Sequence, residues 1–100
     1  MSNIASAPAL DALVRIPNHV VYRSFVHETV VLNLETGRYH GLNPTAGQML
    51  SALEAAGSIR GALESLTETF PTAGPELEHD LLTFCDNAQQ RGLIELTESA

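Results

Sequence analysis

Residues 28–42 read ETVVLNLETGRYHGL and predict two strands joined by a tight turn. Three apolar residues share one face of the first strand, which is the pattern of a sheet covered on one side: Val30, Leu32 and Leu34. Residues 35–37 form a three-residue loop, and Gly37 at its end suits a type I turn closing in a G1 bulge at positive φ. We therefore expect Arg38–Leu42 to pair antiparallel with the preceding strand.

One more strand precedes this pair, and a first helix follows it. Residues 19–25 read HVVYRSF and are rich in β-branched and aromatic residues, so three antiparallel strands are the simplest interpretation. From Asn43 the apolar period changes to 3.6. Asn43 is an N-cap followed by Pro44 at the first helical position, and Gly57 ends this helix.

Two further helices and a short end segment complete the chain. Ser58 caps the second helix, and the third runs from near Pro75 to Gly92. Residues 93–96 form a short last strand or a strap across the core. The expected fold class is α+β, with a three-stranded antiparallel sheet followed by three helices.

Length and composition indicate one domain. A chain of 100 residues fits one hydrophobic core. We expect an N-terminal arm over residues 1–17, a single domain over 18–97 and a tail over 98–100. The N-terminus lacks a basic segment followed by an apolar run, and a single cysteine excludes an internal disulfide. These features favour a cytoplasmic protein.

Charge makes nucleic acid and anionic membranes poor partners. The formal net charge is -7, and all five basic residues are arginines. Affinity for nucleic acid depends on cations that neutralise phosphates, and five scattered arginines are a small supply. The same shortage disfavours an anionic membrane surface.

The sequence contains no recognisable catalytic set. It has no phosphate-binding loop, no dinucleotide fingerprint and neither an HExxH nor a CxxC motif. The four histidines are dispersed, so we expect no metal site and no cofactor. Cys85 lies beside an apolar helical stripe and is expected to be a small buried hydrophobe. We therefore expect a protein that is not an enzyme.

The third strand is the remaining candidate for function. In a three-stranded meander it pairs on one side only, so its other edge can accept a peptide strand. This strand has no proline or lysine to protect it. The alternative is that the edge is short, or covered by residues 1–17.

Several stretches form an ordered combination over about residues 19–96: Val30–Asn43, Thr45-Ala46-Gly47, Asp80-Leu81, Phe84-Cys85 and Arg91–Ile94. Together they resemble the PqqD-like family of precursor-peptide recognition domains. The resemblance implies a winged helix-turn-helix-like fold that binds the leader segment of a ribosomally made, modified peptide. It also implies a non-catalytic chaperone that delivers the precursor to a leader peptidase or another maturation enzyme.

The resemblance also implies which residues bind the peptide. The docking strand would be formed by consecutive residues: Arg38, Tyr39, His40, Gly41 and Leu42. A helix wall beside it would be formed by the third helix: Leu77, Asp80, Leu81 and Phe84. The "LETGRYHGLN" segment is more similar to stand-alone partners of lasso-peptide leader peptidases than to quinone-synthesis members. Cys85 and Ala88 depart from the family pattern, in which a larger aliphatic residue is common.

Two other functions stay open at this point. The winged-helix fold is shared with DNA-binding regulators, but the second helix carries only Arg60 against Glu64 and Glu68. The third helix carries Arg91 at its end against four acidic residues. A purely structural subunit of a synthetase complex, with no peptide contact, is the other alternative.

Overall fold

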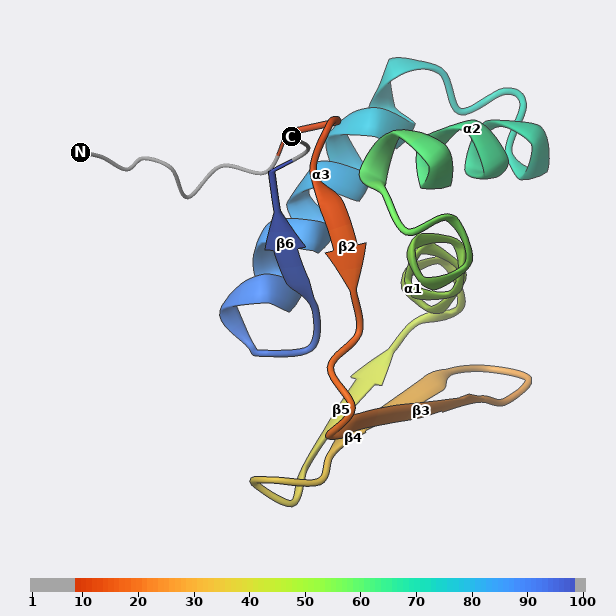
Figure 1. The fold of residues 1–100 in the computed structure, drawn as a ribbon. Helices are drawn as coiled ribbons and strands as arrows, with labels where there is room; N and C mark the ends of the chain where they lie inside the picture. The colour runs from red at the N-terminus through yellow and green to blue at the C-terminus, as the bar shows by residue number, and fades with distance from the viewer. Residues whose placement is uncertain (1–8, 99–100) are drawn as a thin grey trace.

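A computed structural model describes residues 9–98 and shows an α+β fold with two antiparallel sheets (Figure 1). The elements follow in the order β2 (Leu13–Arg15), β3 (Val20–Ser24), β4 (Thr29–Asn33), β5 (Arg38–Leu42), α1 (Pro44–Ala56), α2 (Ile59–Thr69), α3 (Pro75–Gln90) and β6 (Glu95–Thr97). The predicted three-stranded sheet has the order β3-β4-β5, and the three predicted helices follow it.

The helix ends are fixed by the predicted capping residues. The Asn43 side chain accepts a hydrogen bond from the backbone N–H of Ala46, and Gly57 ends α1 in the left-handed conformation. The Ser58 side chain accepts a hydrogen bond from the N–H of Gly61 at the start of α2. These local signals set the positions of α1 and α2 directly after β5.

The turn between β4 and β5 is one residue longer than the sequence analysis predicts. Asn33 lies opposite Arg38, so the loop comprises residues 34–37. The Asn33 side-chain oxygen accepts hydrogen bonds from the N–H groups of Glu35 and Thr36, which ends the strand before Leu34. The positive φ predicted for Gly37 is confirmed, at 73°.

The prediction that Val30, Leu32 and Leu34 form the buried face of β4 is wrong. The structure buries Thr29, Val31 and Asn33, whereas Leu34 is 58% exposed. Gly47 of α1 packs directly on Thr29, and a Cβ at Gly47 would overlap the Thr29 hydroxyl. Because β4 carries apolar residues on both faces, its alternation alone could not select the face that meets α1.

A second, two-stranded sheet joins the ends of the described chain. Leu13 lies opposite Thr97 in the β2–β6 pair. Val14 donates to the carbonyl of Gly57 (2.9 Å) and thereby ties β2 to the α1–α2 connection. Part of the predicted N-terminal arm is thus built into the fold. Its residues 1–8, and residues 99–100 of the predicted tail, lie outside the described residues, and the division into arm, domain and tail stays a prediction.

The helices form a layer on one face of the β3–β4–β5 sheet. Figure 1 shows α1 next to the sheet, with α2 and α3 beyond it. The largest fully buried side chains come from every layer of this stack: Val31, Leu50, Leu53, Ile59, Leu81, Cys85, Leu93 and Ile94. None of the helices described is long and apolar enough to cross a membrane.

Candidate functional site

The backbone hydrogen bonds of the sheet show which groups of β5 remain free. The Leu34 N–H donates to the His19 carbonyl (2.6 Å), and the Gly37 N–H donates to the Asn33 carbonyl (2.8 Å). Even-numbered residues of β4 therefore bond to β3, and odd-numbered residues bond to β5. His40 lies opposite Val31 and faces β4 with its N–H and C=O.

The alternation leaves two residues of β5 with outward-facing backbone groups. These are Tyr39 and Gly41, whose N–H and C=O point away from β4. In the part of the chain that the structure describes, no strand pairs with this edge. The edge thus offers two donors and two acceptors in the geometry that an added antiparallel strand requires.

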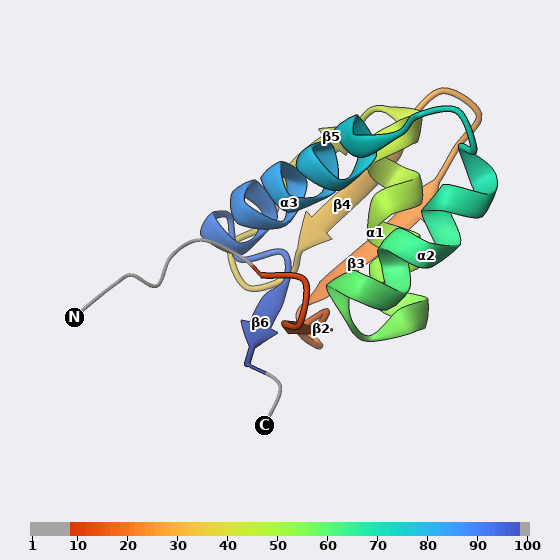
Figure 2. The same cartoon turned by 90° about the horizontal axis from the view of Figure 1, so that it is seen from above.

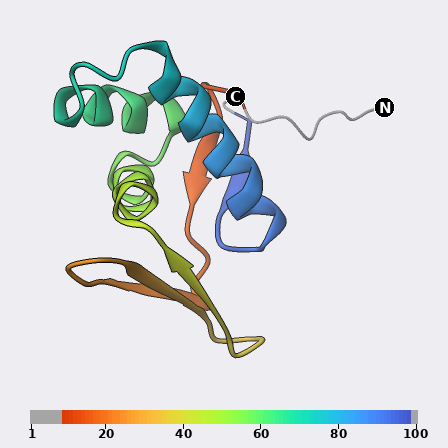
Figure 3. The same ribbon diagram turned by 180° about the vertical axis from the view of Figure 1, so that it is seen from behind.

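The α3 helix lies on the same side of the molecule as this edge. Viewed from above, α3 runs across the β5 side of the sheet, and viewed from behind, both elements lie on the near side (Figures 2 and 3). Close packing of β5 involves β4 and α1, whereas α3 packs chiefly on α2. The two elements that the sequence predicts to hold a peptide are therefore neighbours without being packed tightly together.

The structure divides the predicted helix wall into buried and accessible side chains. Leu77 and Leu81 are buried in the core. Asp80 is exposed, and Phe84 is half-buried. The pKa of Arg60 in α2 is raised chiefly by Asp11 and least by Glu78, which lies on the opposite flank of α3. We infer that the Asp80 and Phe84 flank is the one on the side of β5.

That flank continues beyond the residues predicted from the sequence. Asn87 and Arg91 follow Phe84 by three and seven residues, so they lie on the same stripe of the helix or just past its end. Both are exposed. Helical spacing from Phe84 is the signal that could have added them to the predicted site.

The side chains of β5 alternate between the two faces of the sheet. Leu42 is buried against the helices, and His40 is half-buried on the same face. Tyr39 points to the opposite face and is 72% exposed. In β5, the residues whose side chains face the helices, His40 and Leu42, are therefore not the ones whose backbone groups are free, Tyr39 and Gly41.

Titratable groups at other positions have structural roles. Burial raises the pKa of the Cys85 thiol to about 12, so it stays protonated at neutral pH and is a poor nucleophile. This agrees with the predicted role of Cys85 as a buried hydrophobe. Burial and the neighbouring Glu54, which accepts a hydrogen bond from the Tyr22 hydroxyl, raise the pKa of Tyr22. Among residues 9–98 no group of three or more metal-ligating side chains occurs.

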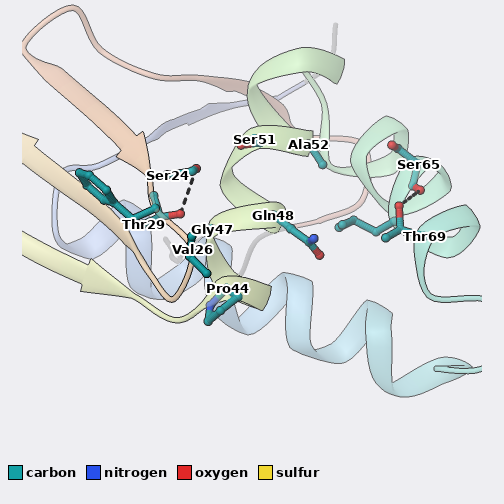
Figure 4. A pocket seen from close by; sticks show the side chains of 12 residues that line it. Ser24, Val26, Thr29, Pro44, Gly47, Gln48, Ser51, Ala52, Ser65 and Thr69 are labelled. Atoms are coloured by element: carbon teal, nitrogen blue, oxygen red, sulfur yellow. Dashed lines mark hydrogen bonds between the residues drawn. The ribbon is translucent and has the colours of Figure 1, made fainter.

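A cavity lies at the other edge of the sheet. It has a volume of about 490 Å³, is open to solvent and is bordered by the β3–β4 hairpin, α1 and α2 (Figure 4). Hydroxyl groups line much of it, and the Ser24 and Thr29 hydroxyls are 3.1 Å apart. None of its lining side chains is charged. No feature of the sequence predicts this cavity.

Comparison with known proteins places these features in a family. The family model for coenzyme PQQ synthesis protein D (PqqD) matches residues 28–94. A solved structure, "TbiB1 in Complex with the TbiA(beta) Leader Peptide", matches with a TM-score of 0.72 and 27% sequence identity. The match covers 81% of this chain and 94% of that chain. A search of curated protein sequences found no significant match.

The family match begins at the end of the β3–β4 turn and runs to the buried residue Ile94. It therefore includes β4, β5 and all three helices, which are the elements that form the candidate site. This span exceeds half of the chain and confirms the resemblance found in the sequence. The chain belongs to the PqqD family.

Proposed function

We propose that this protein binds the leader segment of a ribosomally made precursor peptide as an added strand on β5. The single observation that carries the proposal is the free edge of β5 beside α3. Its support from known proteins is the membership of the PqqD family and the similarity to TbiB1, a structure containing a leader peptide.

The backbone groups of Tyr39 and Gly41 supply the main-chain part of the binding. Each contributes one N–H donor and one C=O acceptor to the leader strand. Hydrogen bonds of this kind depend little on the peptide sequence. Selection of one leader must therefore come from side chains beside the strand.

The accessible flank of α3 supplies that selection. Phe84 offers a half-buried aromatic surface to an apolar leader side chain. Asp80, one turn earlier, favours a basic leader residue near this position. Leu77 and Leu81 act from the core by holding α3 in place. The docking strand and helix wall thus act together, with direct contacts from β5, Asp80 and Phe84.

The bound precursor is then presented to a separate maturation enzyme, a leader peptidase or another modifying enzyme. We place the protein in the cytoplasm, because its single cysteine excludes an internal disulfide. We place it in a pathway of the lasso-peptide type, because its LETGRYHGLN segment resembles stand-alone partners of lasso-peptide leader peptidases. We assign it no catalytic step of its own. The helices and the β3–β4 hairpin are consistent with the winged helix-turn-helix-like architecture that the family resemblance implies.

DNA binding receives less support from the same surface. Arg60, the only basic residue of α2, is paired with Asp11 at 2.8 Å. Arg15 is paired with Glu95 across the β2–β6 sheet. Two of the five basic side chains are thus already bound to carboxylates, in a protein of net charge -7.

Fluorescence anisotropy tests the proposal. The probe is a labelled leader peptide encoded by the precursor gene beside this one, with a sequence-scrambled peptide as the control. We expect saturable binding of the leader and at least about tenfold weaker binding of the scrambled peptide, equivalent to about 1.4 kcal/mol. Equal binding of both peptides, or tighter binding of a labelled DNA duplex at physiological salt, would contradict the proposal.

A further inference from the structure

Gly41 lies within β5, yet its backbone conformation does not require a glycine. It is not among the glycines with positive φ in the part of the chain that the structure describes. A glycine inside a strand weakens the strand, because it has no side chain to pack, and it often marks a close approach by another group. Free space above the strand is therefore what a glycine supplies at this position.

A carboxylate lies beside that space. Gly41 precedes the buried Leu42, and Glu28 precedes the buried Thr29, so both positions face the surface of the sheet that is turned away from the helices (Figure 1). We call this surface the outer face. A Cβ added at Gly41 would lie only 3.3 Å from Oε1 of Glu28. The Phe25 N–H donates to the Glu28 carbonyl (2.7 Å), which fixes the backbone that carries this carboxylate.

The Glu28 carboxylate forms no ion pair within residues 9–98. The basic residue nearest to it in the sheet register is Arg23 of β3. Arg23 lies opposite Val30, and Val30 lies opposite Gly41, so Arg23 and Gly41 are at the two ends of one row. The carboxylate lies at the Gly41 end of this row, beside the free edge of β5. It is therefore available to a cation that arrives with an added strand.

The alternation of an added strand determines which leader residue meets this carboxylate. The residue opposite Gly41 has its side chain on the outer face, whereas the residue opposite His40 points toward the helices. Directly opposed Cβ positions are about 4.5–5.5 Å apart, so a side chain must extend across Gly41 to contact Glu28. Lysine and arginine fit this requirement, because their apolar stems can cover Gly41 and the half-buried Val30 while the charged group meets the carboxylate.

We propose that Glu28 selects a lysine or arginine at the leader position opposite Gly41, and that the glycine provides the space for that side chain. This inference rests on the proposed function and adds a selective contact on the face of the sheet that is remote from α3. Asp80 lies on the helix side, so the basic leader residue that it favours points the other way. The two leader positions are therefore separated by an odd number of residues.

A double-mutant cycle measured by fluorescence anisotropy tests the inference. The probes are the labelled leader peptide encoded beside this gene and variants of it, in each of which one lysine or arginine is replaced by glutamine. We expect Glu28→Gln to weaken binding of the unmodified leader about two- to fivefold, as for an exposed ion pair. One leader variant should bind the unmodified protein more weakly by a similar factor, and Glu28→Gln should not weaken its binding further.

Glu68→Gln is the matched control for net charge. It removes the same charge from an exposed position on α2 and should leave leader affinity unchanged. Charge exchange provides a second test: Glu28→Lys should weaken leader binding more than Glu28→Gln does, and glutamate at the coupled leader position should recover most of that loss. Thermal unfolding of each variant verifies the fold.

The possible failures are distinguishable. Equal leader affinity of Glu28→Gln and the unmodified protein would overturn the inference and leave the proposed function intact. A loss of affinity in Glu28→Gln that is the same for every leader variant would also overturn it, because no basic leader residue would then be the partner of Glu28. Failure of the unmodified protein to bind the leader at all would instead contradict the proposed function.

Discussion

The two edges of the β3–β4–β5 sheet are chemically similar in backbone and different in surroundings. By the same alternation, Tyr22 and Ser24 of β3 present outward groups as Tyr39 and Gly41 of β5 do. The β3 edge is engaged from α1, because the Tyr22 hydroxyl donates to Glu54, and it borders the hydroxyl-lined cavity. The β5 edge lies beside a helix that is not tightly packed on it.

A free edge alone is therefore not sufficient to define a peptide site. Strand addition needs room for an extra strand and side chains that select the peptide. We propose that β5 has both, with room at its unpaired edge and selective side chains on α3. At β3 the neighbouring side chains serve the contact between sheet and helices.

Proline at position 40 should destabilise the fold. The His40 N–H faces β4, so His40→Pro removes a ladder hydrogen bond and leaves the opposing carbonyl without a partner. We expect a loss of about 2–3 kcal/mol in the free energy of unfolding. Urea denaturation followed by circular dichroism measures it, and a change of less than about 0.5 kcal/mol would show that the register is misassigned.

A methyl group at position 47 should weaken the contact between α1 and the buried face of β4. In Gly47→Ala, the new Cβ overlaps the Thr29 hydroxyl, so α1 and β4 must move apart. We expect a destabilisation of about 1–3 kcal/mol from overpacking. The same denaturation assay applies, and Ala46→Ser, one residue earlier on α1, is the control for a small change outside this contact. Unchanged stability in Gly47→Ala would contradict the close approach.

A proline placed at each free edge in turn should weaken leader binding at the β5 edge and not at the β3 edge. Tyr39→Pro removes an outward N–H and should weaken leader binding at least about tenfold, or about 1.4 kcal/mol, without unfolding the sheet. Ser24→Pro removes an outward N–H from β3 and should leave leader affinity within about twofold. Anisotropy titrations compare the two variants. Equal losses of affinity would mean that the leader does not distinguish the edges.

Charge reversal on α3 should have the smallest effect. Asp80 is exposed, so an ion pair with the leader would be screened by solvent. We expect Asp80→Lys to change the binding free energy by about 0.5–1 kcal/mol, and the effect to shrink at high salt. Glu76→Lys is the matched control on an exposed turn farther from Phe84. A larger effect in Glu76→Lys would place the peptide on another flank of α3.

Local signals made most of the fold predictable from the sequence. Asn43 and Pro44 begin α1, Gly57 ends it and Gly37 takes positive φ, because each acts through its own backbone geometry. Pairing over distance was harder to predict. The β2–β6 pair joins two three-residue strands from opposite ends of the chain, which are too short to show a period.

The sequence predicts which segments form the candidate site, but not which way the backbone groups and side chains of those segments point. The sequence predicts β5 as a strand, but hydrogen bonds such as that from Leu34 to His19 are needed to show that Tyr39 and Gly41 face outward and His40 faces inward. Spacing on α3 could not separate the buried Leu81 from the accessible Phe84. The face of β4 was assigned wrongly because Val30 and Leu32 make the other face more apolar than the buried one, which carries Thr29, Val31 and Asn33.

Amide hydrogen exchange measured by NMR, with and without the leader peptide, tests strand addition on β5 most directly. An added strand converts the outward N–H groups of Tyr39 and Gly41 into hydrogen-bond donors, so their exchange should slow at least about tenfold at saturating leader. The outward N–H groups of Tyr22 and Ser24 should exchange at unchanged rates. Slowed exchange on β3 with Tyr39 and Gly41 unaffected would contradict the account.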